Sequence, residues 1–503
     1  PADGRDDPGL DALSTLPRSA LRQLKLLCDT GGAVAAQAAI AQLALASGLY
    51  AGPVLGNVDI PALGFYDPAH GALDGLPLSD GRPHALVTFY RSYLAAADTG
   101  PVDALIGSLR QRGFDAYGAF APSLKAPGID DWLRAHFERR PPAAIVNATA
   151  FSAISDGGAT PFDAVACPVF QVALSTARRE DWAASLRGLS AADLAMHVVL
   201  PEVDGRIFAG VVSFKSPDAR DADLQFARLA HQPDERRVDA VVERISSWHR
   251  LAQIPACDKR LAIVLSSYPG RPHQIAHAVG LDALASAETL LSDLLTCGFD
   301  VASGRLLGQA LGEADMRWSV GDYRAALATL APQLQDDVAK VWGVPESDPL
   351  VRDGAFRFAA LRRGKAVIAV QPERGETGQR DADYHDLSRT PRHGYVAFYL
   401  WLRSQSIDAL IHMGAHGTLE WLPGKSVALS ESCWPEALTG GLPVIYPFIV
   451  NDPGEAAQAK RRIGAVTIGH LPPPLAASTL PQNLVRLEQL LDEYSTADGL
   501  DPA

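Results

Sequence analysis

Residues 408–425 have the sequence DALIHMGAHGTLEWLPGK, a short apolar run followed by polar side chains set among glycines. The apolar run from Asp408 to Ile411 is typical of a buried strand. Glycines and a proline interrupt the rest of the stretch, so its backbone cannot continue as a plain helix. Polar groups just past the end of a strand in an α/β protein are where ligands usually bind. The stretch therefore predicts a ligand site.

Strands and helices alternate on both sides of this stretch. Helices of ten or so residues that alternate with strands are typical of βαβ units and a parallel sheet. Strand-like apolar runs occupy residues 84–90, 143–147, 168–173, 206–214, 260–266, 365–371 and 444–450, and helical spacing occurs at 102–112, 236–251, 395–403 and 453–462. We therefore predict an α/β fold of several domains, with mostly parallel sheets flanked by helices.

Three domains account for this pattern. The 503 residues suffice for about three or four domains, each with its own core. We place an N-terminal α/β domain at 1–195, a central α/β domain at 196–345, and a third α/β domain at 346–503 that carries residues 408–425.

Composition excludes several classes of protein. The net charge of −13 argues against nucleic acid as a main partner, because phosphate binding needs a concentrated basic face. The five cysteines are not closely spaced, so neither a thiolate zinc site nor a disulfide framework is expected, and a reducing cytoplasm is the simplest compartment. The most apolar stretch, Ala33 to Leu49, is predicted to be a buried helix and not a membrane span.

Polar residues follow three of the strands predicted in the third domain. The carboxyl ends of parallel strands meet at one edge of a sheet, so these residues are expected to form one site. They are Glu373 and Arg374 after the strand at 365–371, then His412, His416, Glu420, Trp421 and Lys425 after the strand at 408–411, and Asn451 and Arg461 after the strand at 444–450. Imidazole and carboxylate together suit a borderline divalent ion such as Co²⁺, Ni²⁺ or Zn²⁺.

Each of these residues also has a structural alternative. A single histidine beside an apolar strand is more often a hydrogen-bonded structural residue than a ligand, although two histidines and a glutamate within nine residues roughly even those odds. The charges of the helix at 453–462 indicate a solvated face, on which Arg461 could hold a substrate carboxylate. Gly424-Lys425-Ser426 resembles the end of a phosphate-binding loop, but Leu419 stands where that loop requires glycine. We therefore exclude an ATP site there.

Several motifs together resemble the large subunits of aerobic cobaltochelatase, a family homologous to the large porphyrin-binding subunits of magnesium chelatase. The resemblance covers most of the chain and is most specific at residues 412–425. It is carried by HMGAHGTLEWLPGK at 412–425, CWPEALTGGLP at 433–443, NDPGE at 451–455, AKRR at 459–462, NAT at 147–149, LPEVDG at 200–205 and VGLD at 279–282. The residues at positions 418, 421 and 422, Thr418, Trp421 and Leu422, resemble those of the cobalt branch.

The resemblance implies a specific activity. Large subunits of this family bind a metal-free tetrapyrrole and are where the metal enters the ring. In the cobalt branch Co²⁺ is inserted, as a substrate, into hydrogenobyrinic acid a,c-diamide on the aerobic route to cobalamin. ATP and Mg²⁺ are bound by partners, an AAA+ ATPase subunit and its companion subunit, which agrees with the missing phosphate loop. The chain is thus expected to be the catalytic large subunit of a cytoplasmic cobaltochelatase, a ligase that forms nitrogen–metal bonds.

Metal insertion assigns roles to the site residues. Two pyrrolic protons must leave and the hydrated metal must lose water. We expect His412, His416 and Glu420 to be the metal ligands and catalytic residues, with Glu420 accepting a proton or completing the ligand set. Substrate-binding roles are expected for Lys425, Arg374, Glu373, Asn451, Arg461 and Trp421, the cationic ones by pairing with substrate carboxylates.

Two alternatives stay open, a magnesium-protoporphyrin chelatase component of the H type and a non-catalytic tetrapyrrole carrier or sensor. Because family members are considerably longer, the resemblance also implies that this chain is a fragment, truncated in its first domain and incomplete at the end of its third.

Overall fold

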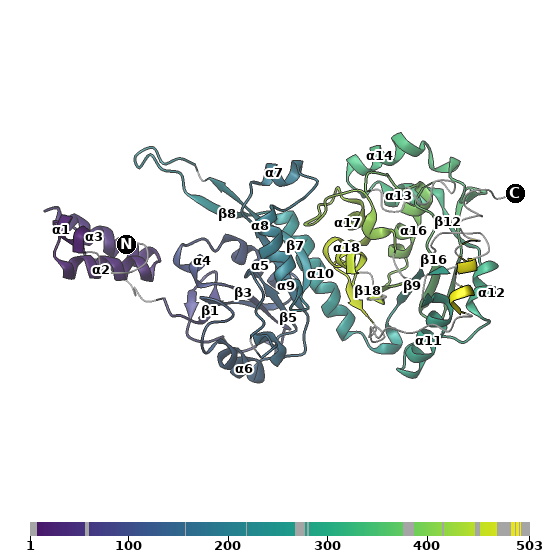
Figure 1. The fold of residues 1–503 in the computed structure, drawn as a ribbon, viewed down its shortest axis with the longest axis horizontal. Helices are drawn as coiled ribbons and strands as arrows, with labels where there is room; N and C mark the ends of the chain where they lie inside the picture. Colours follow the sequence, from purple (N-terminus) through teal and green to yellow (C-terminus); the bar gives the residue numbers. More distant parts are fainter. Residues whose placement is uncertain are drawn as a thin grey trace.

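The computed structural model describes residues 8–55, 60–155, 157–217, 219–266, 277–278, 281–375, 387–414, 417–447 and 453–469, and the helical residues 484–487, 489–491 and 493. Three bodies follow one another along the long axis of the molecule: a group of N-terminal helices, a first α/β unit and a second α/β unit (Figure 1). Helix α10 (Glu235–Gln253) lies between the two α/β units (Figure 1).

The N-terminal helices are α1 (Pro8–Leu13), α2 (Arg18–Thr30) and α3 (Ala33–Ala46). The prediction of a helix at the Ala-rich stretch is confirmed, but its predicted burial is wrong. Ala35 and Ala39 are buried, whereas Ile40 is 67% exposed, because α2 covers only one side of α3. Of the helices in the described ranges, none combines the length and apolar character needed to cross a membrane.

The first α/β unit contains an eight-stranded sheet in the order β2-β1-β4-β3-β5-β6-β7-β8. The strands from β4 to β7 run parallel, and antiparallel pairs close both edges. Alternate residues of β3 face opposite layers, Val87 toward α5 and α10 and Leu86 toward α6. The strands are β1 (Gly64–Asp67), β2 (Gly71–Leu73), β3 (His84–Tyr90), β4 (Asp115–Ala121), β5 (Ala144–Asn147), β6 (Val169–Ser175), β7 (Ile207–Pro217) and β8 (Leu229–Pro233).

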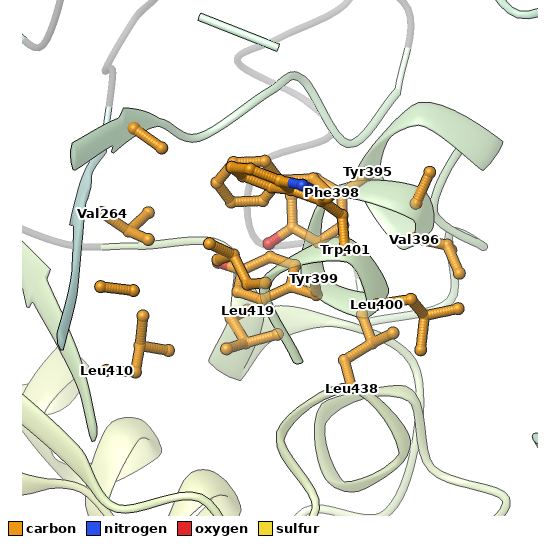
Figure 2. Close-up of a cluster of buried hydrophobic side chains, with 14 of the residues drawn as sticks. Val264, Tyr395, Val396, Phe398, Tyr399, Leu400, Trp401, Leu410, Leu419 and Leu438 are labelled. Atoms are coloured by element: carbon orange, nitrogen blue, oxygen red, sulfur yellow. The ribbon is translucent and has the colours of Figure 1, made fainter. Parts of the chain in front are cut away.

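The second α/β unit contains a six-stranded sheet in the order β15-β16-β9-β17-β18-β19. All its pairs are parallel except that of β15 with β16. One face packs on α11, and the other packs on α16, α17 and α18. Figure 2 shows the part of this second cluster around α16. The strands are β9 (Leu261–Leu265), β15 (Ala360–Arg363), β16 (Ala366–Val370), β17 (Ala409–Met413), β18 (Val444–Pro447) and β19 (Val466–Ile468).

The remaining elements connect these strands or form small additions. In the first unit they are α4 (Arg91–Ala95), α5 (Gly100–Gln111), α6 (Ile129–Arg139), η1 (Pro161–Ala164), α7 (Arg179–Ala184), α8 (Ala191–Leu194), the π-helix η2 (Ala195–Val199) and α9 (Leu200–Glu202). The 3₁₀ helix η3 (Ala256–Asp258) follows α10 and is bonded to Lys365 of the second unit. In the second unit they are β10 (His277–Ala278), β11 (Leu281–Asp282), α11 (Ala283–Thr296), α12 (Leu307–Gly312), β12 (Met316–Ser319), α13 (Val320–Leu327), α14 (Pro332–Trp342), η4 (Pro345–Ser347), β13 (Val351–Arg352), β14 (Ala355–Phe358), α16 (His393–Ser404), η5 (Leu419–Trp421), α17 (Trp434–Thr439) and α18 (Pro453–Ile463).

Mostly parallel sheets covered by helices on both faces confirm the predicted fold class. The strands group differently from the predicted ranges 1–195, 196–345 and 346–503. Strands β7 and β8 continue the sheet of β6, whereas β9 pairs with β16 and β17 of the last range. The reason is that α10 carries the chain from the first sheet to the second, so β9 finds its partners about a hundred residues further on.

Candidate functional site

Strands β16, β17 and β18 bring polar side chains to one edge of the second sheet. Gln371 directly follows β16, His412 lies near the end of β17, and Tyr446 lies in β18. Glu420 lies in η5, the short 3₁₀ turn that follows β17 in the chain. All four side chains are buried, so residues from distant parts of the sequence form one enclosed polar cluster.

The His412 imidazole is fully buried, with an exposed fraction of 0%. Its Nε2 atom lies 3.4 Å from both Gln371 Nε2 and the Tyr399 hydroxyl, and the Tyr446 ring stacks on it with centroids 4.9 Å apart. Burial lowers the pKa of His412 to about 4, which favours the neutral imidazole that a metal requires. Its Nδ1 atom is buried without a hydrogen-bond partner among the described residues.

The Glu420 carboxyl group is also fully buried, with an exposed fraction of 0%. Its Oε1 atom accepts hydrogen bonds from the Gly417 amide at 3.1 Å and the Tyr446 hydroxyl at 3.2 Å. Burial, with a smaller contribution from the nearby Glu455, raises the pKa of Glu420 to about 7. Its Oε2 atom is buried and has no hydrogen-bond partner within the described ranges. Because a buried acceptor without a partner is costly, this oxygen is suited to receive a ligand.

Gly417 lies between these two side chains. A Cβ atom on Gly417 would lie 2.5 Å from His412 Cε1, 2.9 Å from the Tyr446 hydroxyl and 3.1 Å from Glu420 Oε2. Only glycine fits at this position. The reason is the close approach of these three atoms, since Gly417 does not have a positive φ. Gly417 is thus flanked by the side chains of His412 and Glu420. Each of them has one buried atom without a partner among the described residues, the imidazole Nδ1 and the carboxyl Oε2. Such a pair fits a borderline divalent ion.

A layer of tyrosines that was not predicted from the sequence surrounds the cluster. Gln371 Nε2 donates to the hydroxyls of Tyr395 at 2.9 Å and Tyr399 at 2.6 Å, and the Tyr395 hydroxyl lies 2.8 Å from Thr418 Oγ1. Both tyrosines come from α16 and lie among apolar side chains such as Phe398 (Figure 2). Their spacing of four residues on a predicted helix was the available signal, because it places them on one helix face.

Arg374 and Trp421 lie beside each other, next to Glu455. Arg374 Nη1 donates to the Trp421 carbonyl at 3.1 Å, and Trp421 Nε1 donates to Glu455 Oε2 at 2.6 Å. Glu373, the neighbour of Arg374, is half-buried. The interpretation of helix 453–462 as a solvated face is wrong for its inner side, because Glu455 is 6% and Arg462 is 2% exposed.

Lys425 does not lie with the His412 and Glu420 cluster as predicted. Its ammonium group donates to the carbonyls of Trp182 at 2.7 Å, Ala183 at 2.9 Å and Ser185 at 2.8 Å, and lies 5.0 Å from the centroid of the Trp182 ring. All three protons are therefore engaged at the end of α7 in the first unit. In this geometry the ammonium group has no remaining donor for a substrate carboxylate.

Arg461 is likewise engaged between the two units. Its guanidinium pairs with the carboxylate of Glu202, in the first unit, at 2.7 Å. Glu202 thus takes the place of the substrate carboxylate that was predicted to bind Arg461. His416 and Asn451 lie outside the described residues, so their predicted roles stay predictions. No group of three or more His, Cys, Asp or Glu side chains fit to hold a metal occurs within the part of the chain that the structure describes.

Comparison with known proteins agrees with this architecture. The family model described as CobN/Magnesium Chelatase matches residues 42–503. The chain is 38% identical to the aerobic cobaltochelatase subunit CobN of Sinorhizobium sp, over 100% of this chain and 42% of the relative. It is 28% identical to the H component of magnesium chelatase from Rhodobacter capsulatus, over 86% of this chain and 39% of the relative.

A solved structure has the same fold. The catalytic subunit of cobaltochelatase from Mycobacterium tuberculosis matches with a TM-score of 0.75 and 33% identity, over 99% of this chain and 44% of that one. The chain therefore spans less than half the length of each of these relatives. The matched range and the shared fold confirm the predicted resemblance, and the chain belongs to the CobN/magnesium chelatase family.

Proposed function

We propose that this chain is part of the large, tetrapyrrole-binding subunit of a chelatase that inserts Co²⁺ into hydrogenobyrinic acid a,c-diamide. One observation carries the proposal: Nδ1 of His412 and Oε2 of Glu420, which have no hydrogen-bond partner among the described residues, belong to buried side chains that flank Gly417. The similarity to cobaltochelatase subunits supports the choice of metal and ring.

The chemistry follows from these two groups. A neutral imidazole and a carboxylate hold Co²⁺ without trapping it as a thiolate set would. His416, if it reaches the same ion, completes the ligand set. Glu420 accepts a pyrrolic proton as the metal enters, because its free oxygen has no competing donor among the described residues. The Tyr446 hydroxyl and the Gly417 amide keep the other oxygen in place.

ATP hydrolysis is proposed to take place on other subunits of the complex. The family resemblance assigns ATP and Mg²⁺ to partners, an AAA+ subunit and its companion. The sequence GKS at 424–426 lacks the rest of a phosphate loop, which supports that assignment. The proposed compartment is the cytoplasm. Arg374, Glu373, Trp421 and Asn451 remain the proposed contacts to the substrate.

The first experiment is an equilibrium titration of the chain with hydrogenobyrinic acid a,c-diamide and, separately, protoporphyrin IX, followed by absorbance and fluorescence quenching. Preference for the corrinoid is expected. Preference for protoporphyrin IX would instead assign the chain to the magnesium branch. If either ring binds but Co²⁺ does not, a carrier or sensor becomes the better assignment.

The role of the carboxylate is tested by Glu420→Gln, which keeps the shape and removes the charge. Its matched control is Glu346→Gln, an exposed glutamate paired only with Arg324 among the described residues. With the partner subunits present, Glu420→Gln should lower cobalt insertion by about 100-fold or more, within the range for a lost general base. Tetrapyrrole affinity should be unchanged. Equal insertion by both variants would remove Glu420 from the mechanism.

A further inference from the structure

Helix α18 carries two adjacent arginines with opposite environments. Arg461 pairs with Glu202, and its side chain is 26% exposed. Arg462 is only 2% exposed and faces the loop at 420–425. Its guanidinium forms no ion pair with a described carboxylate, and burial lowers its pKa to about 10, so it remains charged at neutral pH.

The Arg462 guanidinium is satisfied by main-chain carbonyls of one loop. Nε donates to the Lys425 carbonyl at 3.0 Å, Nη2 donates to the Leu422 carbonyl at 2.8 Å, and Nη1 donates to the Glu420 carbonyl. A buried charge is tolerated only where hydrogen bonds replace its lost hydration, and a planar fork with five donors suits three carbonyls that point inward. The arginine therefore requires this loop conformation.

The same loop connects the predicted site to the first unit. At its beginning is Glu420, whose carboxyl group lies beside His412 and Gly417. At its end is Lys425, whose ammonium group binds the last carbonyls of α7. Between them Gly424 has a φ of +149°, and a Cβ there would lie 2.7 Å from Cys433 Cβ, so the loop fits closely on the start of α17.

We propose that Arg462 is a positioning residue for Glu420: it holds the loop at 420–425 so that the carboxyl group stays beside the His412 imidazole. The inference rests on the proposed function, because the position of Glu420 matters for metal only if Glu420 acts on the metal. Arg462 touches neither His412 nor the Glu420 carboxyl group in any described contact. Its effect is transmitted through the main chain.

The local effect is tested first, by hydrogen exchange with peptide resolution on Arg462→Ala and the matched control Arg461→Ala. The Trp421 and Leu422 amides are bonded within the turn, to the Thr418 and Leu419 carbonyls. In Arg462→Ala they should exchange at least about tenfold faster, as expected for local opening, while a peptide over β3 is unchanged. Unchanged exchange at both amides would overturn the proposal.

The link to metal is tested with Co²⁺ alone, by visible absorption of the full chain. Arg462→Ala should weaken Co²⁺ binding by about tenfold or more, and Arg461→Ala should leave it unchanged, since preorganised ligands set the affinity. Guanidinium ion at tens of millimolar should restore part of the Arg462→Ala loss, which a general loss of stability would not allow. Wild-type Co²⁺ affinity in Arg462→Ala would refute the positioning role.

Two further outcomes separate the inference from the proposed function. If the wild-type chain binds no Co²⁺ but Arg462→Ala still speeds exchange in the loop, the metal site fails and the loop contact stands. If Arg462→Ala does not fold, Arg462→Lys replaces it. A lysine keeps the charge but has no planar fork, so the same two measurements should give smaller changes in the same direction.

Discussion

The narrowest feature of the site is the space at Gly417, and Gly417→Ala tests it with a single added methyl group. The new Cβ would lie 2.5 Å from His412 Cε1, whereas two carbon atoms at rest need about 3.5–4.0 Å. Either His412 or the turn that carries Glu420 must therefore move by about 1 Å. Overpacking of this kind costs about 1–3 kcal/mol of unfolding free energy.

The effect on function should exceed the effect on stability. A displacement of about 1 Å between reacting groups lowers rates by about 100-fold. We therefore expect Gly417→Ala to fold, to lose about 1–3 kcal/mol, and to lose nearly all Co²⁺ binding and insertion. Urea unfolding measures the first effect, and visible absorption of added Co²⁺ measures the second.

The matched control is Gly107→Ala in α5, where an added Cβ meets nothing within 4 Å. It should stabilise the chain by about 0.5–1 kcal/mol, because glycine within a helix is unfavourable relative to alanine. It should leave Co²⁺ binding unchanged. If Gly417→Ala binds Co²⁺ like the wild type and like Gly107→Ala, the crowding between His412 and Glu420 does not exist as described, and the site assignment falls with it.

Three other predictions concern stability. Lys425→Met should lose about 3 kcal/mol in urea unfolding, about 1 kcal/mol for each of the three hydrogen bonds that the ammonium group donates. Exposed Lys340→Met should change the unfolding free energy by less than about 0.5 kcal/mol; equal effects would contradict the contact with α7. Burial lowers the pKa of His84 to about 3 and of half-buried His136 to about 4, so both are neutral when folded, and their contribution is present above pH 6.5 and lost as pH falls toward these values. Between pH 7.5 and 5, His84 should account for a loss of about 2 kcal/mol of unfolding free energy, and His136 for less. Equal unfolding free energies in urea titrations at the two pH values would contradict this. Tyr446→Phe should cost about 1–2 kcal/mol, because it removes a donor from a buried carboxyl group; an unchanged urea midpoint would show that this hydrogen bond is not formed.

Central strands of both sheets were predictable from local sequence. The strand predicted at 84–90 coincides with β3 of the first sheet, and those predicted at 260–266 and 365–371 contain β9 and β16 of the second. These strands are buried on both faces, so each is a continuous apolar run that needs no knowledge of its partners. The helix predicted at 395–403 lies within α16 for a similar reason, since its apolar residues recur with helical spacing.

Charged side chains were less predictable. Arg461 and Arg462 are neighbours in the chain, but Arg461 pairs with Glu202 and Arg462 holds the loop at 420–425. Lys425, the cation of that loop, binds carbonyls of α7. A charge is buried only where the fold supplies acceptors, and those acceptors come from residues about 37 to 260 positions away in the chain. No local pattern contains that information.

The sequence by itself determined the central buried strands, such as those at 84–90, 260–266 and 365–371, and that His412 and Glu420 follow one strand closely enough to share a site. Periodicity and glycine placement are local properties, so a single chain reveals them. Only the tertiary structure decided that Tyr446 stacks on His412, that the buried oxygen of Glu420 lacks a donor among the described residues, and that β9 joins a sheet with strands a hundred residues later. These depend on which distant surfaces meet, and the free energy of that meeting comes from burial across the whole core.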